Sequence, residues 1–371
     1  MFSYKWKIMK VLIVSDGFSS NLYSDSFTQP FEEFGHEVSH FYWKGYFKNY
    51  QYPNHLTPSD DSKIKSLYYR FQNKFTFGPV INQINKDLIK RATEFQPDLV
   101  FIYRGTHLFG KTIRSIRENG CRVFSYNNDD PFSPNYPKYY WRLHKEIVKE
   151  CDVVYAYRLA NINDYRNIGV ENVKLLRSYY VSSSNFCIPG VVKDIDIVFI
   201  GHFENDGRDS LMLSLFESEY NVKLFGTGWE KSPYYNEIVK LNGPIKPVYQ
   251  DYNLTINRSK IALVFLSKLN RDTYTRRCFE IPSTKTMMLS EYSEDLSSLF
   301  EPNVEAFFFK NKTEFENKID YLLNNKEVIE RVSLSGYKRI IHDGHEVKDR
   351  VRAIINDFNQ LPQIDKGTFN G

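Results

Sequence analysis

The sequence predicts an α/β protein built from two Rossmann-like, doubly wound domains that face each other across a cleft. Short apolar runs alternate with helix-length segments throughout, which is typical of parallel sheets covered by helices. Several runs, such as Ile195–Ile200, are continuous rather than alternating, as expected of strands buried on both faces. The length of 371 residues suits two domains of about 150–190 residues each.

The apolar runs are the expected strands. They are Met9–Val14, Glu37–Tyr42, Asp98–Tyr103, Arg122–Tyr126, Val153–Tyr157, Val173–Leu176, Ile195–Ile200, Val222–Phe225, Ile261–Phe265, Thr286–Leu289 and Ala306–Phe309. Ligands of doubly wound sheets bind at the carboxyl ends of the strands, so functional residues are expected directly after these runs.

The domain boundary is expected in residues 181–192, VSSSNFCIPGVV, because a Ser run, an Asn and a Pro-Gly pair are typical of turns and linkers. Residues 1–180 would form the N-terminal domain and residues 193–345 the C-terminal domain. We expect residues 346–361 to form a helix that packs back on the N-terminal domain, and residues 362–371 to be a tail.

Charge and cysteine content restrict the class of protein. Lys and Arg number 49 against 45 for Asp and Glu, and this net charge of +4 is too small to indicate nucleic-acid binding. The four cysteines form no CxxC pair, so we expect reduced thiols and a cytoplasmic protein. No apolar run reaches the roughly 18 residues of a membrane span.

Aromatic residues make up 16% of the chain and concentrate in Phe41–Tyr52, where lysines lie among them. Ordinary packing is one explanation. The alternative is a surface that meets a lipid-linked acceptor at the inner face of the cytoplasmic membrane.

The segment Arg271–Glu291 carries the strongest functional signal. Thr275 is a good helix N-cap, and Arg276, Arg277 and Glu280 would share one face of the helix that follows. Free backbone N–H groups beside two arginines suit a diphosphate, and a carboxylate one turn later can accept both hydroxyls of a ribose. The alternative is a solvated helix end with an Arg–Glu pair.

The same segment resembles the CgeB-like glycosyltransferases, which are named for a spore maturation protein. The resemblance rests on Arg277-Cys278-Phe279-Glu280, Ile281-Pro282, Met288-Leu289-Ser290-Glu291-Tyr292, Asp295-Leu296 and Leu299-Phe300-Glu301-Pro302. It implies the GT-B architecture, with the acceptor on the N-terminal domain and a nucleotide-sugar donor on the C-terminal domain. It also implies a catalytic acid pair at Asp272 and Glu280, although Asp272 stands where that pattern has Glu.

Other donor-site residues follow from the architecture and the resemblance. Gly201, directly after an expected strand, lets the backbone approach a phosphate, and Arg208 stands where relatives carry a cation for the diphosphate. Gly226 follows another expected strand. Trp229 would stack on the nucleotide base unless it belongs to the core. Tyr249 lies where relatives contact the base.

Three strands of the N-terminal half end in polar residues that would form the acceptor side. These residues are Asp16 and Gly17, Arg104 and His107, and Asp129 and Asp130. Asp130 is the first candidate for a general base that deprotonates an acceptor hydroxyl, and His107 is the second. The alternative for Asp130 is a turn, since Asp-Pro commonly opens one.

Two sequences that match metal-binding motifs are not expected to bind metal. His36–His40 matches HExxH, but it is predicted to enter a strand, on which Glu37 points away from both histidines. Asp194–Asp196 matches DxD, but it opens a buried strand after Pro-Gly. We therefore expect neither a metal nor another cofactor.

The hypothesis is transfer of a sugar from a UDP-, GDP- or TDP-linked donor to a hydroxyl of a glycan or lipid-linked acceptor, as in bacterial surface polysaccharide synthesis. Arg208, Arg276 and Arg277 would neutralise the leaving diphosphate in place of a metal. Two alternatives remain open: a sugar-nucleotide epimerase or hydrolase on the same fold, and a non-catalytic surface or spore-coat protein.

Overall fold

The computed structural model describes residues 8–17, 23–47 and 63–362. The chain divides into two compact units. Unit 1 comprises Met1–Arg177 together with Val347–Gly371, and unit 2 comprises Ser178–Glu346. The last part of Phe41–Tyr52 and the tail after Pro362 lie outside the described residues.

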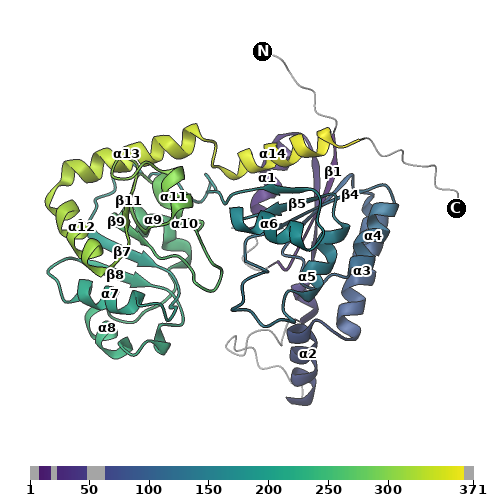
Figure 1. Cartoon of the computed structure of the whole chain (residues 1–371), viewed down its shortest axis with the longest axis horizontal. Helices are drawn as coiled ribbons and strands as arrows, with labels where there is room; N and C mark the ends of the chain where they lie inside the picture. The colour runs from purple at the N-terminus through teal and green to yellow at the C-terminus, as the bar shows by residue number, and fades with distance from the viewer. Residues whose placement is uncertain (1–7, 18–22, 48–62, 363–371) are drawn as a thin grey trace, which may run out of the picture. The chain divides into compact units, whose positions relative to one another are not determined.

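Unit 1 is built on a six-stranded parallel sheet with strand order β2-β1-β3-β4-β5-β6 (Figure 1). The strands are β1 Lys10–Ser15, β2 Glu37–Tyr42, β3 Leu99–Tyr103, β4 Arg122–Asn127, β5 Val153–Ala156 and β6 Val173–Leu175. Strand β3 is buried along its whole length, which confirms the expectation drawn from its continuous apolar run. Strand β1 pairs with both β2 and β3, so the strand order reverses beside its carboxyl end.

The helices of unit 1 cover this sheet. They are α1 Thr28–Glu33, α2 Lys63–Phe75, α3 Pro79–Phe95, α4 Gly110–Glu118, α5 Arg142–Ile147, α6 Leu159–Asn167 and α14 Val347–Gln360, with short 3₁₀ turns at Ser24–Phe27, Lys44–Phe47 and Val148–Glu150. Helix α3 shows why they form: Pro79 occupies its first turn, and Ile81, Ile84 and Leu88 recur at helical spacing and are buried.

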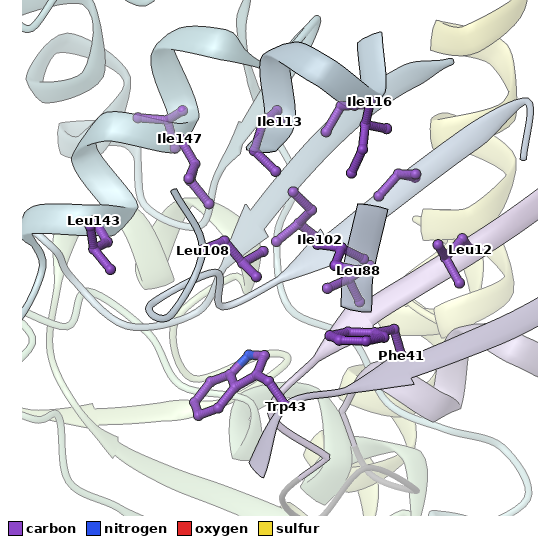
Figure 2. Packing of buried hydrophobic residues seen from close by; sticks show 14 of the residues in the cluster. Leu12, Phe41, Trp43, Leu88, Ile102, Leu108, Ile113, Ile116, Leu143 and Ile147 are labelled. Atoms are coloured by element: carbon purple, nitrogen blue, oxygen red, sulfur yellow. The ribbon is translucent and has the colours of Figure 1, made fainter. Parts of the chain in front are cut away.

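The core of unit 1 lies between the sheet and helices α3, α4 and α5. Figure 2 shows Leu12 and Ile102 of the sheet meeting Leu88, Ile113 and Ile147 of these helices. All five side chains are fully buried, and burial of each contributes about 1.5–3 kcal/mol. This packing holds the carboxyl ends of the strands in place.

Helix α14, the last helix within the described residues, belongs to unit 1. Asp357 accepts hydrogen bonds from the Tyr155 hydroxyl at 2.8 Å and from the Lys174 ammonium at 2.6 Å. The ring of Phe358 packs against Phe124. These contacts tie the end of the chain to β4, β5 and β6.

Unit 2 contains a five-stranded parallel sheet with strand order β11-β10-β9-β7-β8. The strands are β7 Ile195–Ile200, β8 Val222–Phe225, β9 Ser259–Val264, β10 Met287–Glu291 and β11 Phe307–Phe309. The helices are α7 Arg208–Phe216, α8 Tyr235–Asn242, α9 Tyr252–Asn257, α10 Arg277–Ser283, α11 Glu294–Leu299, α12 Lys312–Asn324 and α13 Lys326–His342, with 3₁₀ turns at Trp229–Lys231 and Tyr249–Asp251. Strand β7 pairs with both β8 and β9, which places the reversal of strand order at its carboxyl end.

The segment predicted as a linker is part of unit 2. The backbone N–H of Ile188 donates to the Asn257 side chain at 2.8 Å, and that of Phe186 donates to Asn253 at 3.1 Å. Both asparagines lie on α9, so side chains of this helix hold the segment in place. None of the helices in the described ranges is both long and apolar enough to span a membrane.

Candidate active site

Two glycines join the carboxyl ends of β7 and β8 in unit 2. The N–H of Gly201 donates to the Phe225 carbonyl at 2.9 Å, and the indole N–H of Trp229 donates to the Gly201 carbonyl at 2.9 Å. Gly226 has φ +150°, and a Cβ there would lie 1.8 Å from the Gly201 oxygen. Only glycine fits at position 226, because any side chain would displace the neighbouring backbone.

The guanidinium of Arg277 lies against this turn. A Cβ at Gly201 would stand 3.2 Å from Arg277 Nη2. The structure therefore brings Gly201 and Arg277 together at the carboxyl edge of the sheet, as the sequence predicted. No ion pair to Arg277 is present within the described residues. A cation without a carboxylate partner is suited to binding an anion.

Glu280 lies one turn further along α10, and two neighbouring side chains hold its carboxylate in place. Its Oε1 lies 2.5 Å from Arg276 Nε, and its Oε2 accepts a hydrogen bond from the Tyr252 hydroxyl at 2.8 Å. Burial and then the charge of Glu280 raise the pKa of Tyr252 well above its ordinary value, so this hydroxyl stays protonated. Each carboxylate oxygen has a further lone pair, so Glu280 can still accept from a ligand hydroxyl.

Arg208 does not offer its charge at the surface, and the prediction of a direct diphosphate contact is corrected. Its guanidinium is buried and donates to both carboxylate oxygens of Asp206, at 2.8 and 2.6 Å, and to the His202 carbonyl at 2.8 Å. It also packs over the ring of Phe199. Arg208 thus holds the β7–α7 loop in shape.

Trp229 and Tyr249 differ sharply in exposure. Trp229 is 1% exposed and packs against Phe199 and Phe203, so the prediction that it stacks on a base is wrong and the core alternative holds. Tyr249 is 81% exposed. Its loop lies beside β8, because the Gly226 N–H donates to the Lys246 carbonyl at 3.1 Å.

The N-terminus of helix α10 differs from the predicted one, in which the Thr275 side chain caps the helix. Its N-cap is Arg276, and no side chain caps it. The backbone N–H of Thr275 instead donates to Cys278 Sγ at 3.5 Å, so the predicted capping by the Thr275 hydroxyl is wrong. Asp272 lies in the preceding loop, where its N–H donates to the Ser267 carbonyl at 2.9 Å.

His202 is a candidate that the sequence reasoning did not select. Partial desolvation and then the positive charge of Arg277 lower the pKa of His202, an exposed residue. The imidazole is therefore neutral at physiological pH. Its position directly after Gly201, at a strand end, was the available signal.

In unit 1, Arg104 gathers two acids at the carboxyl ends of β1, β3 and β4. Its Nε donates to Asp129 Oδ2 at 2.8 Å, and its Nη1 lies 3.6 Å from Asp16 Oδ2. Burial opposes the charge, but Asp129 and Asp16 more than offset this and raise the pKa of Arg104. Gly17 completes the predicted acceptor side, with φ +74° and its Cα beside the Tyr42 ring.

The two proposed general bases are both interior residues, and these predictions are corrected. Asp130 is fully buried and accepts hydrogen bonds from the Phe132 N–H at 3.0 Å and the Asn161 side chain at 2.8 Å. The bond to the Phe132 N–H, two residues on, is the turn that was the alternative for Asp130. His107 stacks on Trp43 with ring centroids 3.8 Å apart. Burial lowers the pKa of His107 to about 3, so it has little capacity to hold a proton at neutral pH.

The two metal-like motifs have structural roles. Glu37–Tyr42 forms strand β2, as predicted, and His36 Nδ1 accepts the Met9 N–H at 3.2 Å. Asp194 pairs with Arg258 and Asp196 with Lys260, both at 2.5 Å. Within the described ranges there is no group of three or more His, Cys, Asp or Glu arranged for a metal ion. Metal independence of the reaction stays a prediction.

Comparison with known proteins agrees with this arrangement. Residues 208–356 match the family described as glycosyl transferase-like. HepE of Anabaena, solved in complex with UDP and glucose, superimposes with a TM-score of 0.65 at 12% identity over 95% of this chain and 100% of that one. The chain has the GT-B fold.

Two further solved structures share this fold. The sucrose-phosphate synthase of Thermosynechococcus elongatus superimposes with a TM-score of 0.65 at 10% identity, over 95% of this chain and 98% of that one. A putative UDP-N-acetylglucosamine 2-epimerase from Listeria monocytogenes gives 0.59 at 10% identity, over 96% and 98%. No curated protein matches the chain by sequence. Membership of the narrower CgeB-like family stays a prediction.

Proposed function

We propose that the protein transfers a sugar from a nucleoside-diphosphate sugar to a hydroxyl of a glycan or lipid-linked acceptor. One observation carries the proposal: Arg277 lies without a carboxylate partner, within the described residues, against the glycine turn at the carboxyl end of β7. Nucleotides bind doubly wound sheets at this point of strand reversal. The crystal structure of HepE with UDP and glucose supports this choice of donor class.

Each residue of the cluster has a role in binding the donor. Arg277 neutralises charge on the diphosphate as the bond to the sugar breaks, which stabilises the leaving group. Glu280, oriented by Arg276 and Tyr252, accepts the ribose hydroxyls. The exposed ring of Tyr249 stacks on the base. Arg208 shapes the loop beneath the diphosphate.

The acceptor is assigned to the cluster of unit 1. Asp16 and Asp129 are its carboxylates, and Arg104 orients both. A carboxylate that accepts a hydrogen bond from an acceptor hydroxyl increases the nucleophilicity of its oxygen. Bacterial surface polysaccharide synthesis is the setting that this pair of substrates suits.

The donor assignment is tested by a thermal-shift panel of UDP, GDP, TDP and CMP, with and without Mg²⁺. A ligand at 100 times its Kd stabilises the folded state by about 2.7 kcal/mol, so one nucleotide should raise the Tm clearly. The shift should fall to about half or less in Arg277→Ala and persist unchanged in Arg331→Ala, in which the removed arginine is an exposed one elsewhere in unit 2. If no nucleotide raises the Tm, the donor site is misassigned.

The reaction is tested with the nucleotide sugar that binds. Transfer requires an acceptor, so nucleotide release should be slow until a glycan or lipid-linked sugar is added. Rapid turnover of the nucleotide sugar without any acceptor would instead indicate an epimerase or hydrolase. A requirement for Mg²⁺ would refute the proposed replacement of a metal by arginine.

A further inference from the structure

Helix α2 of unit 1 turns its apolar side chains outward. Leu67 is 68% exposed and Phe71 is 53% exposed, and Tyr68 between them is also exposed. Residues three and four apart share a helix face, so these three side chains form one apolar surface. A helix that only completes a core would bury this face.

The face of α2 that packs on unit 1 combines the partly buried Tyr69, which contacts the hydrophobic core, with polar side chains. The buried Gln72 accepts the Val80 N–H at 2.8 Å, at the start of α3. Asn73 Oδ1 lies 2.9 Å from His107 Nε2, within hydrogen-bond distance. These contacts hold the inner face of the helix in place, and Leu67, Tyr68 and Phe71 on its outer face stay exposed.

The outward apolar surface extends beyond the helix. The ring of Phe71 packs on Phe75, with centroids 4.7 Å apart, and Phe75 packs on Tyr139 at 5.0 Å. Phe77, just after the helix, is 69% exposed. These rings belong to or contact helix α2, which lies at the margin of unit 1 (Figure 1).

The charge of α2 is entirely positive. Its sequence, KIKSLYYRFQNKF, contains four basic residues and no acidic one. Arg70 and Lys74 are both exposed beside the apolar surface. Within the described residues of α2, the exposed apolar face is accompanied by cations and by no acid, which complements a surface that is apolar beneath and negatively charged on top.

We propose that α2 binds the surface of an anionic lipid bilayer. Leu67, Tyr68 and Phe71 enter the boundary between headgroups and acyl chains, and Arg70 and Lys74 contact the phosphate layer. This is the arrangement of amphipathic helices that lie in the plane of a membrane. The proposal rests on the outer face of α2 and is independent of the transfer reaction.

Co-sedimentation of the full chain with vesicles tests the proposal. The protein should pellet with phosphatidylcholine vesicles that contain about a third phosphatidylglycerol, and much less with phosphatidylcholine alone. Leu67→Ser/Phe71→Ser should reduce binding at least tenfold, with only a small fall in the Tm because both side chains are mostly exposed and only the Phe71–Phe75 ring contact is lost. The matched control is Leu241→Ser/Ile341→Ser, which removes two similarly exposed apolar side chains of unit 2 and should bind like the wild type.

A second variant tests the charges. Arg70→Gln/Lys74→Gln should lower binding at low salt by about fivefold per charge, and added salt should reduce this difference. The proposal is overturned if the wild type does not pellet with anionic vesicles, or if Leu67→Ser/Phe71→Ser pellets equally well. Self-association that depends on Leu67 and Phe71, without vesicle binding, would assign the face to a second copy of the chain.

Discussion

Each unit gathers arginines and carboxylates near the carboxyl ends of its strands, but arginines outnumber carboxylates in unit 2 and carboxylates outnumber arginines in unit 1. In unit 2, Arg276 and Arg277 accompany one carboxylate, Glu280, so the cluster carries a net charge of +1. In unit 1, Arg104 stands between Asp16 and Asp129, so that cluster carries a net charge of −1. The difference suits the proposed donor site to an anion and the proposed acceptor site to neutral hydroxyl groups.

The backbone around the two clusters differs as well. In unit 2 a Cβ on Gly226 would lie 1.8 Å from the Gly201 oxygen, so the turns after β7 and β8 pack backbone against backbone. In unit 1 the turn after β3 has Arg104 itself at φ +64°, a conformation that is uncommon for a residue with a side chain. Close backbone packing therefore shapes the strand ends of unit 2, whereas a charged side chain occupies the corresponding turn of unit 1.

The largest effect should come from filling the contact between the two glycines. Gly226→Ala should lower the free energy of unfolding by about 3 kcal/mol, because the new Cβ would lie 1.8 Å from the Gly201 oxygen. Urea unfolding measures the loss. Gly243→Ala is the control, since its φ of +83° is also positive but nothing lies within 4 Å of its Cβ. Equal losses would show that backbone strain, and not the close contact, makes glycine necessary at position 226.

Arg277→Ala should weaken nucleotide binding by about 10- to 100-fold, the value of a charge-assisted hydrogen bond of about 1.5–3 kcal/mol. Titration calorimetry measures this loss. Arg277→Lys should recover part of the affinity, because the ammonium keeps the charge without the planar fork. If Arg277→Ala binds the nucleotide as tightly as the wild type, the cluster of Arg276, Arg277 and Glu280 is not the donor site.

Asp129→Asn tests the other side of the comparison. It removes the strongest partner of Arg104, so kcat/KM for the acceptor should fall about tenfold. The Kd for the nucleotide should stay the same, because Asp129 belongs to unit 1. Glu118→Gln, an exposed acid of the same unit, is the control. Weaker nucleotide binding in Asp129→Asn would show that the two clusters do not act on separate substrates.

The smallest effect is expected from Tyr252→Phe, which deletes the hydroxyl that orients Glu280. Nucleotide affinity should fall about two- to tenfold, the value of one hydrogen bond of about 0.5–1.5 kcal/mol. Removal of the ribose hydroxyls from the ligand should make wild type and variant equal. If Tyr252→Phe weakens binding of the 2′,3′-dideoxynucleotide analogue by the same factor as binding of the ribonucleotide, Glu280 does not bind the ribose.

Several site residues could be placed from the sequence because they follow buried strands directly. Gly201 and Gly226 come straight after β7 and β8, and Asp16 and Arg104 straight after β1 and β3. Parallel strands bring their carboxyl ends to one edge of a sheet, so adjacency along the chain was enough to predict adjacency in space. Tyr252, which is not at a strand end, gave no such signal.

The errors at His107 and Asp130 share one cause, which is burial by residues distant in the sequence. His107 lies beneath Trp43 and next to Asn73, and Asp130 accepts a hydrogen bond from Asn161. Each of these residues has the right chemistry for a base, but only its packing partners decide whether it meets solvent. Arg208 differs in that its partner, Asp206, stands two residues away and was overlooked.

The sequence by itself determined the two parallel sheets and the edge of each where polar residues gather, because apolar periodicity and strand ends are local properties. The tertiary structure decided which of those residues remain available. It left Arg277 beside the glycine turn, enclosed Trp229 and His107, and turned the apolar face of α2 outward. Burial and charge pairing depend on segments far apart in the chain, and only the folded chain brings those segments together.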